Sequence, residues 1–423
     1  MSRLIELFGS RRAAAAAGRD HATRPIVVIV RTLLLFESAM YSAVTPVLPH
    51  YAHALHLGKP AVGLLTASYP AGIVPGSLLA AWATARLDAR RATIIGLLVL
   101  AGSVGAFGFG SHIALLDALR FLQGIGCGFI WVGGLTWVIG AAEKERRGRL
   151  LGSVFAAAIL GTILGPVLGT FAVAAGTGLV FSLVGAVALA LAAWTRGRPA
   201  PSEPREREAR PKLRGLITNG PMALGSWLIL LEAATVGATS TLIPLRLAEL
   251  GGSGALIGAT FVLGSALSAV LAGPIGRATD RLGPRPLLWL GLPATAALMA
   301  LLIAPTSAVL LGIVTMAVYG GPLTLYTVPA MTIMTDGSER AGIPVVIASL
   351  VLNLAWALGE AFGAPAAATL SEAGGNAVPL LGLAALMMVT LWPVARLRMP
   401  KPADPGGARA TSHGAASTAP AVR

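Results

Sequence analysis

The sequence predicts an all-α polytopic membrane protein with twelve transmembrane helices in two six-helix, pseudo-symmetric halves. The chain is 55% hydrophobic and only 12% charged, with a mean hydropathy of +0.76, whereas soluble domains carry about 25% charged residues. Apolar windows of about 20 residues, long enough to span a bilayer, recur along the chain. In addition, a stretch of the first half returns in the second half. These observations together exclude a soluble protein.

The predicted spans divide the chain into two halves and a linker. In the first half they lie near 26–49, 61–84, 92–110, 114–140, 150–174 and 177–195. In the second half they lie near 221–245, 254–276, 286–304, 307–333, 343–370 and 376–395. We therefore expect a tail at 1–24, a six-helix half at 25–195, a linker at 196–220, a six-helix half at 221–396 and a disordered tail at 397–423.

An acidic residue lies near the middle of the first span of each half. Glu37 precedes Pro49 by twelve residues, and Glu232 precedes Pro244 by the same number. The match continues without a gap to about Arg91. Because a carboxylate at the centre of a membrane helix costs about 3 kcal/mol or more to insert, it usually faces protein or water and usually has a function. The duplication predicts two parallel repeats with a substrate site near the midplane, where the halves meet.

The basic residues predict the orientation. With both termini inside, the inner segments hold 28 of the 32 Lys and Arg residues; only Lys59 and Arg246 lie outside, and Arg31 and Arg120 lie within spans. Basic residues that flank membrane helices collect in the cytoplasm, so we expect both termini and the linker there. The net charge of +14 then needs no nucleic-acid partner. The single cysteine, Cys127, excludes an internal disulfide and a cysteine-based metal site.

The loop after the eighth predicted span carries the most specific motif. It reads Gly276-Arg-Ala-Thr-Asp280-Arg281-Leu-Gly283-Pro-Arg285. This segment resembles the G-x-x-x-D-R-x-G-x-R signature of the major facilitator superfamily, and the resemblance covers nearly the whole membrane region. Gly283 permits a tight turn, and Asp280 can cap a helix end and pair with nearby arginines to hold one conformer. The resemblance implies a transporter fold in which this loop takes part in gating.

The equivalent loop of the first half departs from the signature. Ala85 replaces its acid and Asp88 replaces its glycine. Members of the family usually keep this first copy well formed, so the substitutions place the gating contact in the second-half loop. Asp88, one turn further on, is a partial substitute for the missing acid.

Within the family, the sequence resembles the drug/proton antiporters with twelve helices. The fifth span reads Gly161-Thr-Ile-Leu-Gly165-Pro166-Val-Leu-Gly169-Thr170. It resembles the exporters' signature G-x-x-x-G-P-x-x-G-G, and only the last glycine is lost, to Thr170. Glycines every four residues allow close approach of a partner helix, and Pro166 bends the helix. We expect a pliable contact between the halves, and the motif favours export over import.

The fourth span carries an arginine that is costly in a membrane unless it is paired or hydrated. The segment that begins Arg120-Phe-Leu-Gln123-Gly resembles the family motif R-x-x-Q-G-x-G, whose arginine is implicated in proton coupling. Trp131 shares a helical stripe with Arg120, so this face can line a cavity. Two other interpretations stay open: Arg120 snorkels to the outer surface, or it forms a purely structural pair with Asp117.

The second-half copy of the exporters' motif places Glu360 where the first half has Pro166. Asn353, Trp356 and Glu360 fall on one helical face, the arrangement expected for a polar wall with an aromatic ring beside a carboxylate. Alternatively, Glu360 is neutral and hydrogen-bonded between helices. Tyr319 is a further candidate for the cavity wall.

The first span completes the candidate site. Glu37 and Tyr41 share a stripe, and the segment resembles the first helix of amine and drug exporters, which place an acid nine residues before the proline at Pro46. We therefore expect Glu37 to be the principal proton-exchanging acid. Glu232 and Glu360 are expected to set the charge preference for the substrate.

These features predict a proton-coupled exporter of small lipophilic or cationic compounds, acting by alternating access as a monomer in the cell membrane. The coupling ion is the proton, and no other cofactor is expected. His50, His53 and His56 recur every third residue, but no acid accompanies them, so we expect no metal site. The sequence shows no pattern of a catalytic nucleophile, a general base and a residue that positions the base, so we expect that the protein is not an enzyme.

Two rival functions stay open. One is an importer or facilitator of an anionic metabolite, with Arg120 as the counter-ion of the substrate. The other is a non-transporting membrane receptor or scaffold, which would need no acid in the first helix of each half.

Overall fold

The computed structural model describes residues 2–142, 146–198, 219–343 and 345–396. Every regular element in these ranges is a helix, which confirms the all-α prediction. Most of the predicted linker and the whole predicted tail at 397–423 lie outside the described residues. The side chains of residues 2–22 are not described either.

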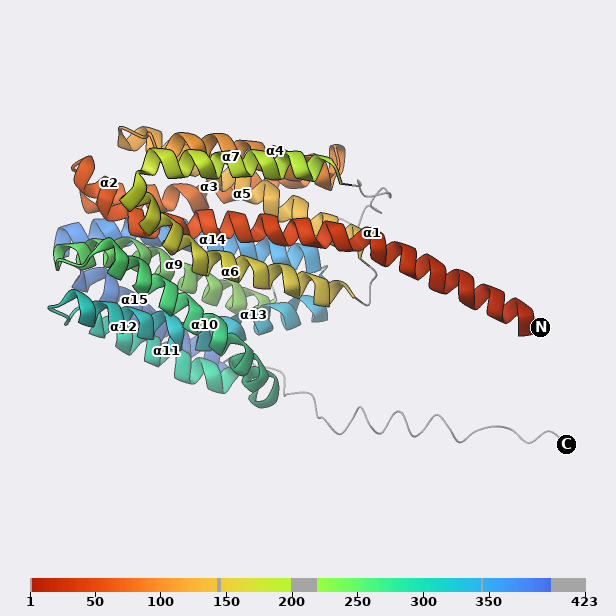
Figure 1. Cartoon of the computed structure of the whole chain (residues 1–423). Coiled ribbons are helices and arrows are strands. Elements are labelled where there is room, and N and C mark those ends of the chain that lie inside the picture. Colours follow the sequence, from red (N-terminus) through yellow and green to blue (C-terminus); the bar gives the residue numbers. More distant parts are fainter. Residues whose placement is uncertain (1, 143–145, 199–218, 344, 397–423) are drawn as a thin grey trace.

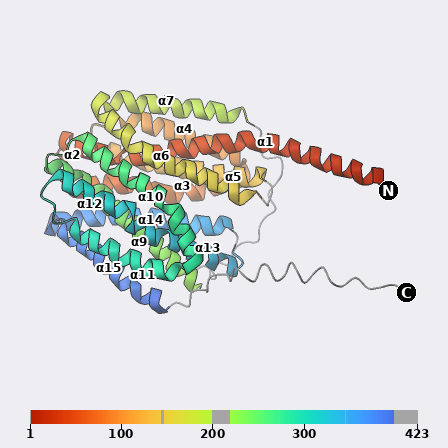
Figure 2. The same cartoon turned by 60° about the horizontal axis from the view of Figure 1, so that its bottom comes forward.

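The first half contains α1 Ser2–Ala43, the short η1 Thr45–Val47 and α2 Leu48–Ala54, then α3 Lys59–Arg86, α4 Ala89–Phe107, α5 Ile113–Ala141, α6 Arg147–Ala175 and α7 Thr177–Arg196. The second half contains α9 Gly220–Glu249, α10 Gly254–Leu282, α11 Pro284–Leu301, α12 Ala308–Gly320, α13 Pro322–Arg340, α14 Val345–Gly374 and α15 Ala377–Arg396. Figure 1 and Figure 2 show the two sets of helices side by side.

The observed helices match the predicted spans, with two breaks. The tenth span is interrupted at Gly321, where Pro322 begins α13. The first span is interrupted near Pro46, the second residue of η1. Proline lacks a backbone N–H, so it removes one helical hydrogen bond and favours a break or bend at this point. In the described chain, eleven helical segments are long and apolar enough to cross a membrane, and α11, with 18 residues, adds the twelfth helix of the bundle.

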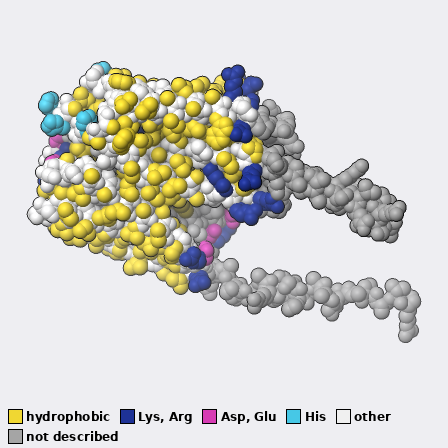
Figure 3. Space-filling view, in the orientation of Figure 1, with side chains coloured by type: hydrophobic (Ala, Val, Ile, Leu, Met, Phe, Trp, Pro, Cys, Tyr) yellow, Lys and Arg dark blue, Asp and Glu magenta, His cyan; other side chains and the backbone are white. Residues whose placement is uncertain are grey.

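The two ends of the bundle differ in their charged side chains. Lys and Arg side chains gather at the end from which the N-terminal part of α1 extends (Figure 1, Figure 3), and we call it the basic end. It carries Arg86, Arg90, Arg91, Arg196, Arg198, Arg277, Arg281, Arg285, Arg340 and Arg396. His50, His53, His56 and His112 lie at the opposite end, which we call the histidine end.

Glycines bring two helices together within each half. A Cβ atom on Gly161, Gly165 or Gly169 of α6 would collide with the backbone of α1, and one on Gly359 or Gly363 of α14 would collide with α9. The predicted contact between the halves is therefore not made by the fifth-span glycines, which α1 of the same half covers, but by Pro166 and Thr170 of the same motif, which approach Gly258 of α10. Small residues every four positions specify that a helix approaches closely, but not which one.

The halves are joined toward the histidine end. There α3 packs against α14, and α6 packs against α10. Lys59 Nζ donates hydrogen bonds to Ser371 Oγ at 3.2 Å and to Asn376 Oδ1 at 3.0 Å. Thr170 Oγ1, at the position where the exporters' signature has its last glycine, donates to the Gly254 carbonyl at 3.4 Å. In this conformer the histidine end is therefore held closed.

The second-half signature loop forms its turn but not its predicted ion pairs. Gly283 ends α10 with a φ of +79°, a left-handed conformation that favours glycine. Asp280 and Arg281 are exposed, and Asp280 makes no hydrogen bond or ion pair with any described residue. The prediction that Asp280 pairs with nearby arginines is therefore wrong for this conformer, in which its side chain is exposed at the basic end of the bundle.

The first-half loop has a different local solution. Asp88, at the position of the signature glycine, has a φ of +151° and accepts a hydrogen bond from the Arg91 N–H at 2.7 Å, which caps α4. The loop arginines behave alike in both halves. Arg90 donates to the Arg198 carbonyl at 2.6 Å, and Arg285 donates to the Ala395 carbonyl, so each arginine caps the end of the last helix of its half.

Candidate functional site

Glu37 lies at the centre of the first half and is hydrogen-bonded through both carboxyl oxygens. Its side chain is only 2% exposed. The Tyr69 hydroxyl donates to Oε1, and the Trp131 Nε1–H donates to Oε2 at 2.7 Å. The Ser38 hydroxyl adds a longer contact to Oε2 at 3.5 Å. Hydrogen bonds to a carboxylate are strong in a dry site, so this acid ties together α1, α3 and α5.

Arg120 points into the same region rather than toward the surface. It is 2% exposed, and its guanidinium carbon lies 4.5 Å from the centre of the Tyr69 ring, in cation–π geometry. Its Nη1 donates to Gln123 Oε1 at 2.7 Å, whereas its Nε is buried without a partner. Its burial rules out the snorkelling interpretation. Asp117 makes no described ion pair with Arg120, and its Oδ1 is buried without a partner.

Glu360 joins the second half to this cluster. It is 1% exposed, and its Oε1 accepts a hydrogen bond from the Tyr41 hydroxyl of α1 at 2.7 Å. Its Oε2 is buried without a partner. The Tyr41 ring lies 5.3 Å from the Trp356 ring and 5.3 Å from the Tyr69 ring. A continuous set of contacts therefore links Glu37 to Glu360 through two tyrosines.

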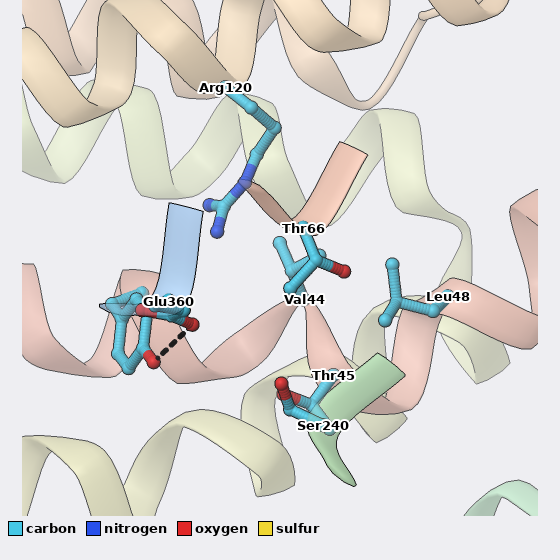
Figure 4. Close-up of a pocket in the computed structure, with 8 residues that line it drawn as sticks. Val44, Thr45, Leu48, Thr66, Arg120, Ser240 and Glu360 are labelled. Atoms are coloured by element: carbon cyan, nitrogen blue, oxygen red, sulfur yellow. Dashed lines mark hydrogen bonds between the residues drawn. The ribbon is translucent and has the colours of Figure 1, made fainter. Parts of the chain in front are cut away.

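A pocket lies between the halves beside this cluster (Figure 4). Elements of both halves line it: Tyr41, Val44, Thr45, Leu48, Thr66, Arg120, Ser240 and Glu360. Figure 4 shows the guanidinium of Arg120 pointing into it from one side, with Glu360 on another. Its cavity volume is about 20 Å³, which is room for about one water molecule and far below the 300–1,000 Å³ of drug-sized ligand sites. In this conformer the pocket is therefore closed around the cluster, and a transported molecule needs a wider conformer.

Three predicted residues of the second half lie apart from the pocket. Glu232 is half-buried and makes no hydrogen bond within the described structure. Tyr319 shares a hydrogen bond with Thr239 at 2.8 Å. Asn353 is half-buried and also makes no described hydrogen bond. Hydrogen bonds and ring contacts link a cluster in which these three take no part in the described structure: Glu37, Tyr41, Gln123, Trp131, Arg120, Trp356 and Glu360.

The sequence analysis missed Tyr69, Thr66 and Ser240. Tyr69 offered a signal, because the chain has only five tyrosines and this one lies in the middle of a span. Thr66 and Ser240 offered none, since small hydroxyls in membrane helices commonly bond to their own backbone. Here Thr66 donates to the Val62 carbonyl at 3.1 Å and Ser240 to the Gly237 carbonyl at 3.3 Å.

Comparisons with known proteins agree with this architecture. The family model described as Major Facilitator Superfamily matches residues 32–360. An uncharacterized MFS-type transporter, YcaD of Escherichia fergusonii, is 29% identical over 270 residues, which cover 62% of this chain and 68% of that protein. YcaD of Escherichia coli strain S88 is 26% identical over 276 residues, with the same coverage of 62% and 68%.

Solved structures show the same fold at low sequence identity. A D-xylose–proton symporter superposes with a TM-score of 0.69 at 16% identity, covering 89% of this chain and 98% of that one. The nucleoside transporter NupG superposes with a TM-score of 0.70 at 13% identity, covering 88% and 98%. A bacterial homologue of the lysosomal transporter Spinster, in an inward-facing and unoccupied conformation, gives 0.69 at 14% identity, covering 88% and 95%.

Proposed function

We propose a function on the premise that the chain belongs to the Major Facilitator Superfamily and is therefore a multi-pass secondary transporter. The proposed function is the export of small lipophilic or cationic molecules in exchange for protons. The observation that carries the proposal is the buried pair of acids, Glu37 and Glu360, in one cluster at the centre of the two halves. Buried ionisable groups inside a membrane protein are expensive and mark ion and substrate paths.

Glu37 is the proposed proton-exchanging acid. Its two strongest donors, Tyr69 and Trp131, come from two other helices of the same half. A movement of α1 against these helices changes how well the charged form of Glu37 is stabilised, so the acid gains or releases a proton as the halves rock. The resemblance of the first span to drug exporters supports the same role.

Glu360 is the proposed acid that meets a cationic substrate. Glu360 lines the pocket and its Oε2 has no partner among the described residues, whereas both oxygens of Glu37 are hydrogen-bonded. Because the two acids belong to one contact network through Tyr41 and Tyr69, a cation at Glu360 favours release of the proton from the network. Binding and proton release are then linked reciprocally, as exchange requires.

The proton gradient is sufficient as an energy source. At an assumed membrane potential of about 150 mV, one inward proton supplies roughly 3.5 kcal/mol. That free energy corresponds to a several-hundred-fold accumulation of a neutral substrate, roughly.

The proposed location is the plasma membrane, with both termini in the cytoplasm. The Lys and Arg side chains at the basic end support this orientation (Figure 3). In that orientation the hydrogen bonds of Lys59 and Thr170 close the external face. A reporter that is active only outside the cell should be silent when fused at Arg205 or after Arg423. Activity at either point would overturn the orientation.

Transport into inside-out membrane vesicles tests the proposed function. A fluorescent lipophilic cation should accumulate in vesicles with an acidic lumen, and the accumulation should collapse when the pH gradient is dissipated. Vesicles that contain the Glu37→Gln variant should exchange the probe downhill without accumulating it. Accumulation that ignores the gradient, or that survives in Glu37→Gln, would contradict proton coupling at this acid.

One observation favours a second candidate function. Arg120 presents a cation to the pocket and makes no ion pair in the described structure. An importer or facilitator of an anionic metabolite would use it as the counter-ion. Uptake of small carboxylates into right-side-out vesicles, lost in Arg120→Gln but indifferent to Glu360→Gln, would favour this function over export.

A further inference from the structure

The central pocket contains two buried polar groups of opposite charge that do not meet. Arg120 uses one hydrogen bond, to Gln123, and its Nε has no partner. Glu360 uses one oxygen, with Tyr41, and its Oε2 has no partner. Both side chains line the same pocket (Figure 4), yet they form no ion pair in the described structure. Each therefore has unused hydrogen-bonding capacity.

Unpartnered groups of this kind are unusual. Buried polar atoms in proteins are nearly always hydrogen-bonded, and an unsatisfied group that persists calls for an explanation. In the same cluster the carboxyl of Glu37 is satisfied at both oxygens, by Tyr69 and Trp131. Other buried atoms of the described chain, such as Asp117 Oδ1, also lack a partner, but Arg120 and Glu360 carry opposite charges and line one pocket. A molecule that bridges the two groups would satisfy both at once.

We infer that the pocket binds the polar head of the transported molecule, and that this head carries an amine beside a carboxylate. The amine would donate to Glu360, and the carboxylate would accept from Arg120. Val44, Leu48 and the Tyr41 ring form the apolar part of the lining, which an attached lipophilic body would contact once the halves separate and the pocket widens. The inference rests on the proposed function, because it names the group that the exported molecule presents to the central site.

The cluster also explains why both charges are needed. A guanidinium over an aromatic ring, as Arg120 lies over Tyr69, stays charged and fixed in place. Glu360 is fixed by Tyr41 from the other half. A ligand that contacts both groups touches both halves, and this is the property that couples binding to the relative movement of the halves.

Four matched probes test the inference on the purified full chain in nanodiscs without a gradient. The probes are 2-naphthylalanine, its methyl ester, its N-acetyl derivative and its N-acetyl methyl ester, which present both charges, the cation alone, the anion alone and neither. We expect the doubly charged probe to bind about tenfold more tightly than either singly charged probe, the gain of roughly one charge-assisted hydrogen bond. Titration calorimetry measures the four affinities.

Two variants separate the two contacts. Arg120→Gln should lower the affinity for 2-naphthylalanine to that for its methyl ester and leave the ester unchanged. Glu360→Gln should lower it to that for the N-acetyl derivative. Tyr326→Phe is the control, because the Tyr326 hydroxyl is buried without a partner and is not part of the pocket. The ratio of two affinities in one sample is insensitive to partial unfolding, which lowers the number of sites for both probes.

The outcomes are decisive. If 2-naphthylalanine binds no more tightly than its methyl ester, or if Arg120→Gln leaves their ratio unchanged, then water or an ion pair formed in another conformer satisfies the two groups, and the inference is overturned. Failure of proton-driven accumulation in vesicles is a separate result, because the binding ratios are measured without a gradient. If 2-naphthylalanine still binds more tightly than its methyl ester but accumulation in vesicles does not respond to the pH gradient, proton coupling would be contradicted and the assignment of the head group would stand.

Discussion

Glu37 and Glu232 lie at equivalent positions of the two repeats, but their surroundings differ. Glu37 is 2% exposed and accepts hydrogen bonds from Tyr69 and Trp131. Glu232 is half-buried and has no described hydrogen-bond partner. The alignment of the repeats places Gly264 at the position of Tyr69. The duplication has therefore kept the acid in both halves and its donor in only one.

The packing of the second half shows why a tyrosine is absent there. A Cβ atom on Gly264 would lie 3.1 Å from the Cβ of Tyr319, tighter than ordinary contact. Helix α10 thus approaches α12 too closely for an aromatic side chain at this position. The comparison teaches that an acid repeated by duplication does not keep its role by position alone. The groups around the acid decide whether its carboxyl oxygens are held by hydrogen bonds, as in Glu37, or have no hydrogen-bond partner in the described structure, as in Glu232.

The largest expected difference concerns charge removal at the two equivalent acids. Glu37→Gln should abolish gradient-driven accumulation, from a ceiling of several-hundred-fold at roughly 150 mV to none. Glu232→Gln should retain accumulation and chiefly weaken cationic substrates. The amide keeps the fold, because its oxygen can accept from Trp131 while its NH2 donates to the Tyr69 hydroxyl. Substrate-induced proton release from the purified variants is the measurement.

The same assay contains its own check. If Glu37→Gln still releases protons on substrate binding as the parent does, the coupling site lies elsewhere, and Glu360 and Arg120 are next to test. If both glutamine variants lose coupling equally, the contrast between the two halves has no functional meaning.

A second prediction concerns the acids of the two signature loops. Asp280→Asn should lower the transport rate about tenfold, a change of roughly 1.4 kcal/mol in the barrier, because only the second-half loop keeps the signature acid. Its apparent melting temperature should not change, since Asp280 is exposed and unpaired in this conformer. Ala85→Asp, which restores the acid of the first-half loop, should change the rate little. Equal rates in all three proteins would remove the gating role of this loop.

The third prediction sharpens the contrast between paired and unpaired tyrosines. Tyr69→Phe removes the donor of Glu37 and should destabilise the protein by about 1–3 kcal/mol, the cost of an unsatisfied buried group. Tyr326→Phe removes a buried hydroxyl that has no hydrogen-bond partner in the described structure, so it relieves an unsatisfied group and should not destabilise the protein. Thermal unfolding of both variants in the same detergent is the comparison. A smaller loss for Tyr69→Phe would mean that Glu37 does not depend on this donor.

The smallest expected effect lies in the first-half loop. Asp88→Ala removes the cap of α4 and should cost about 1 kcal/mol of stability. Asp88→Gly removes the same cap but relieves the positive φ, so it should cost less than the alanine variant. A thermal-shift ranking of parent, glycine and alanine variants measures this. An alanine variant more stable than the glycine one would contradict the role of backbone strain here.

Much of the fold was predictable because membrane spans leave a clear hydrophobic signal and proline breaks leave a local one. The gathering of Glu37, Arg120 and Glu360 was partly predictable, since a charged residue in a span must find a polar site. The helix that packs against the fifth-span glycines was not predictable, because glycines every four residues indicate a close contact but do not specify which helix makes it. The donor Tyr69 and the empty position at Gly264 also depend on distances between helices that no single span encodes.

The glycine seam between α1 and α6 has a mechanical consequence. Gly161, Gly165 and Gly169 contribute no side chain to the contact with α1, so few rotamers there could absorb a displacement of one helix against the other. We therefore expect α1 and α6 to move together as one rigid unit. Thr170 lies near one end of this helix pair and is hydrogen-bonded to the opposite half, and Glu37 lies further along the same pair. A displacement of α6 at the histidine end would therefore reach Glu37 as a movement of the packed helix pair as a whole.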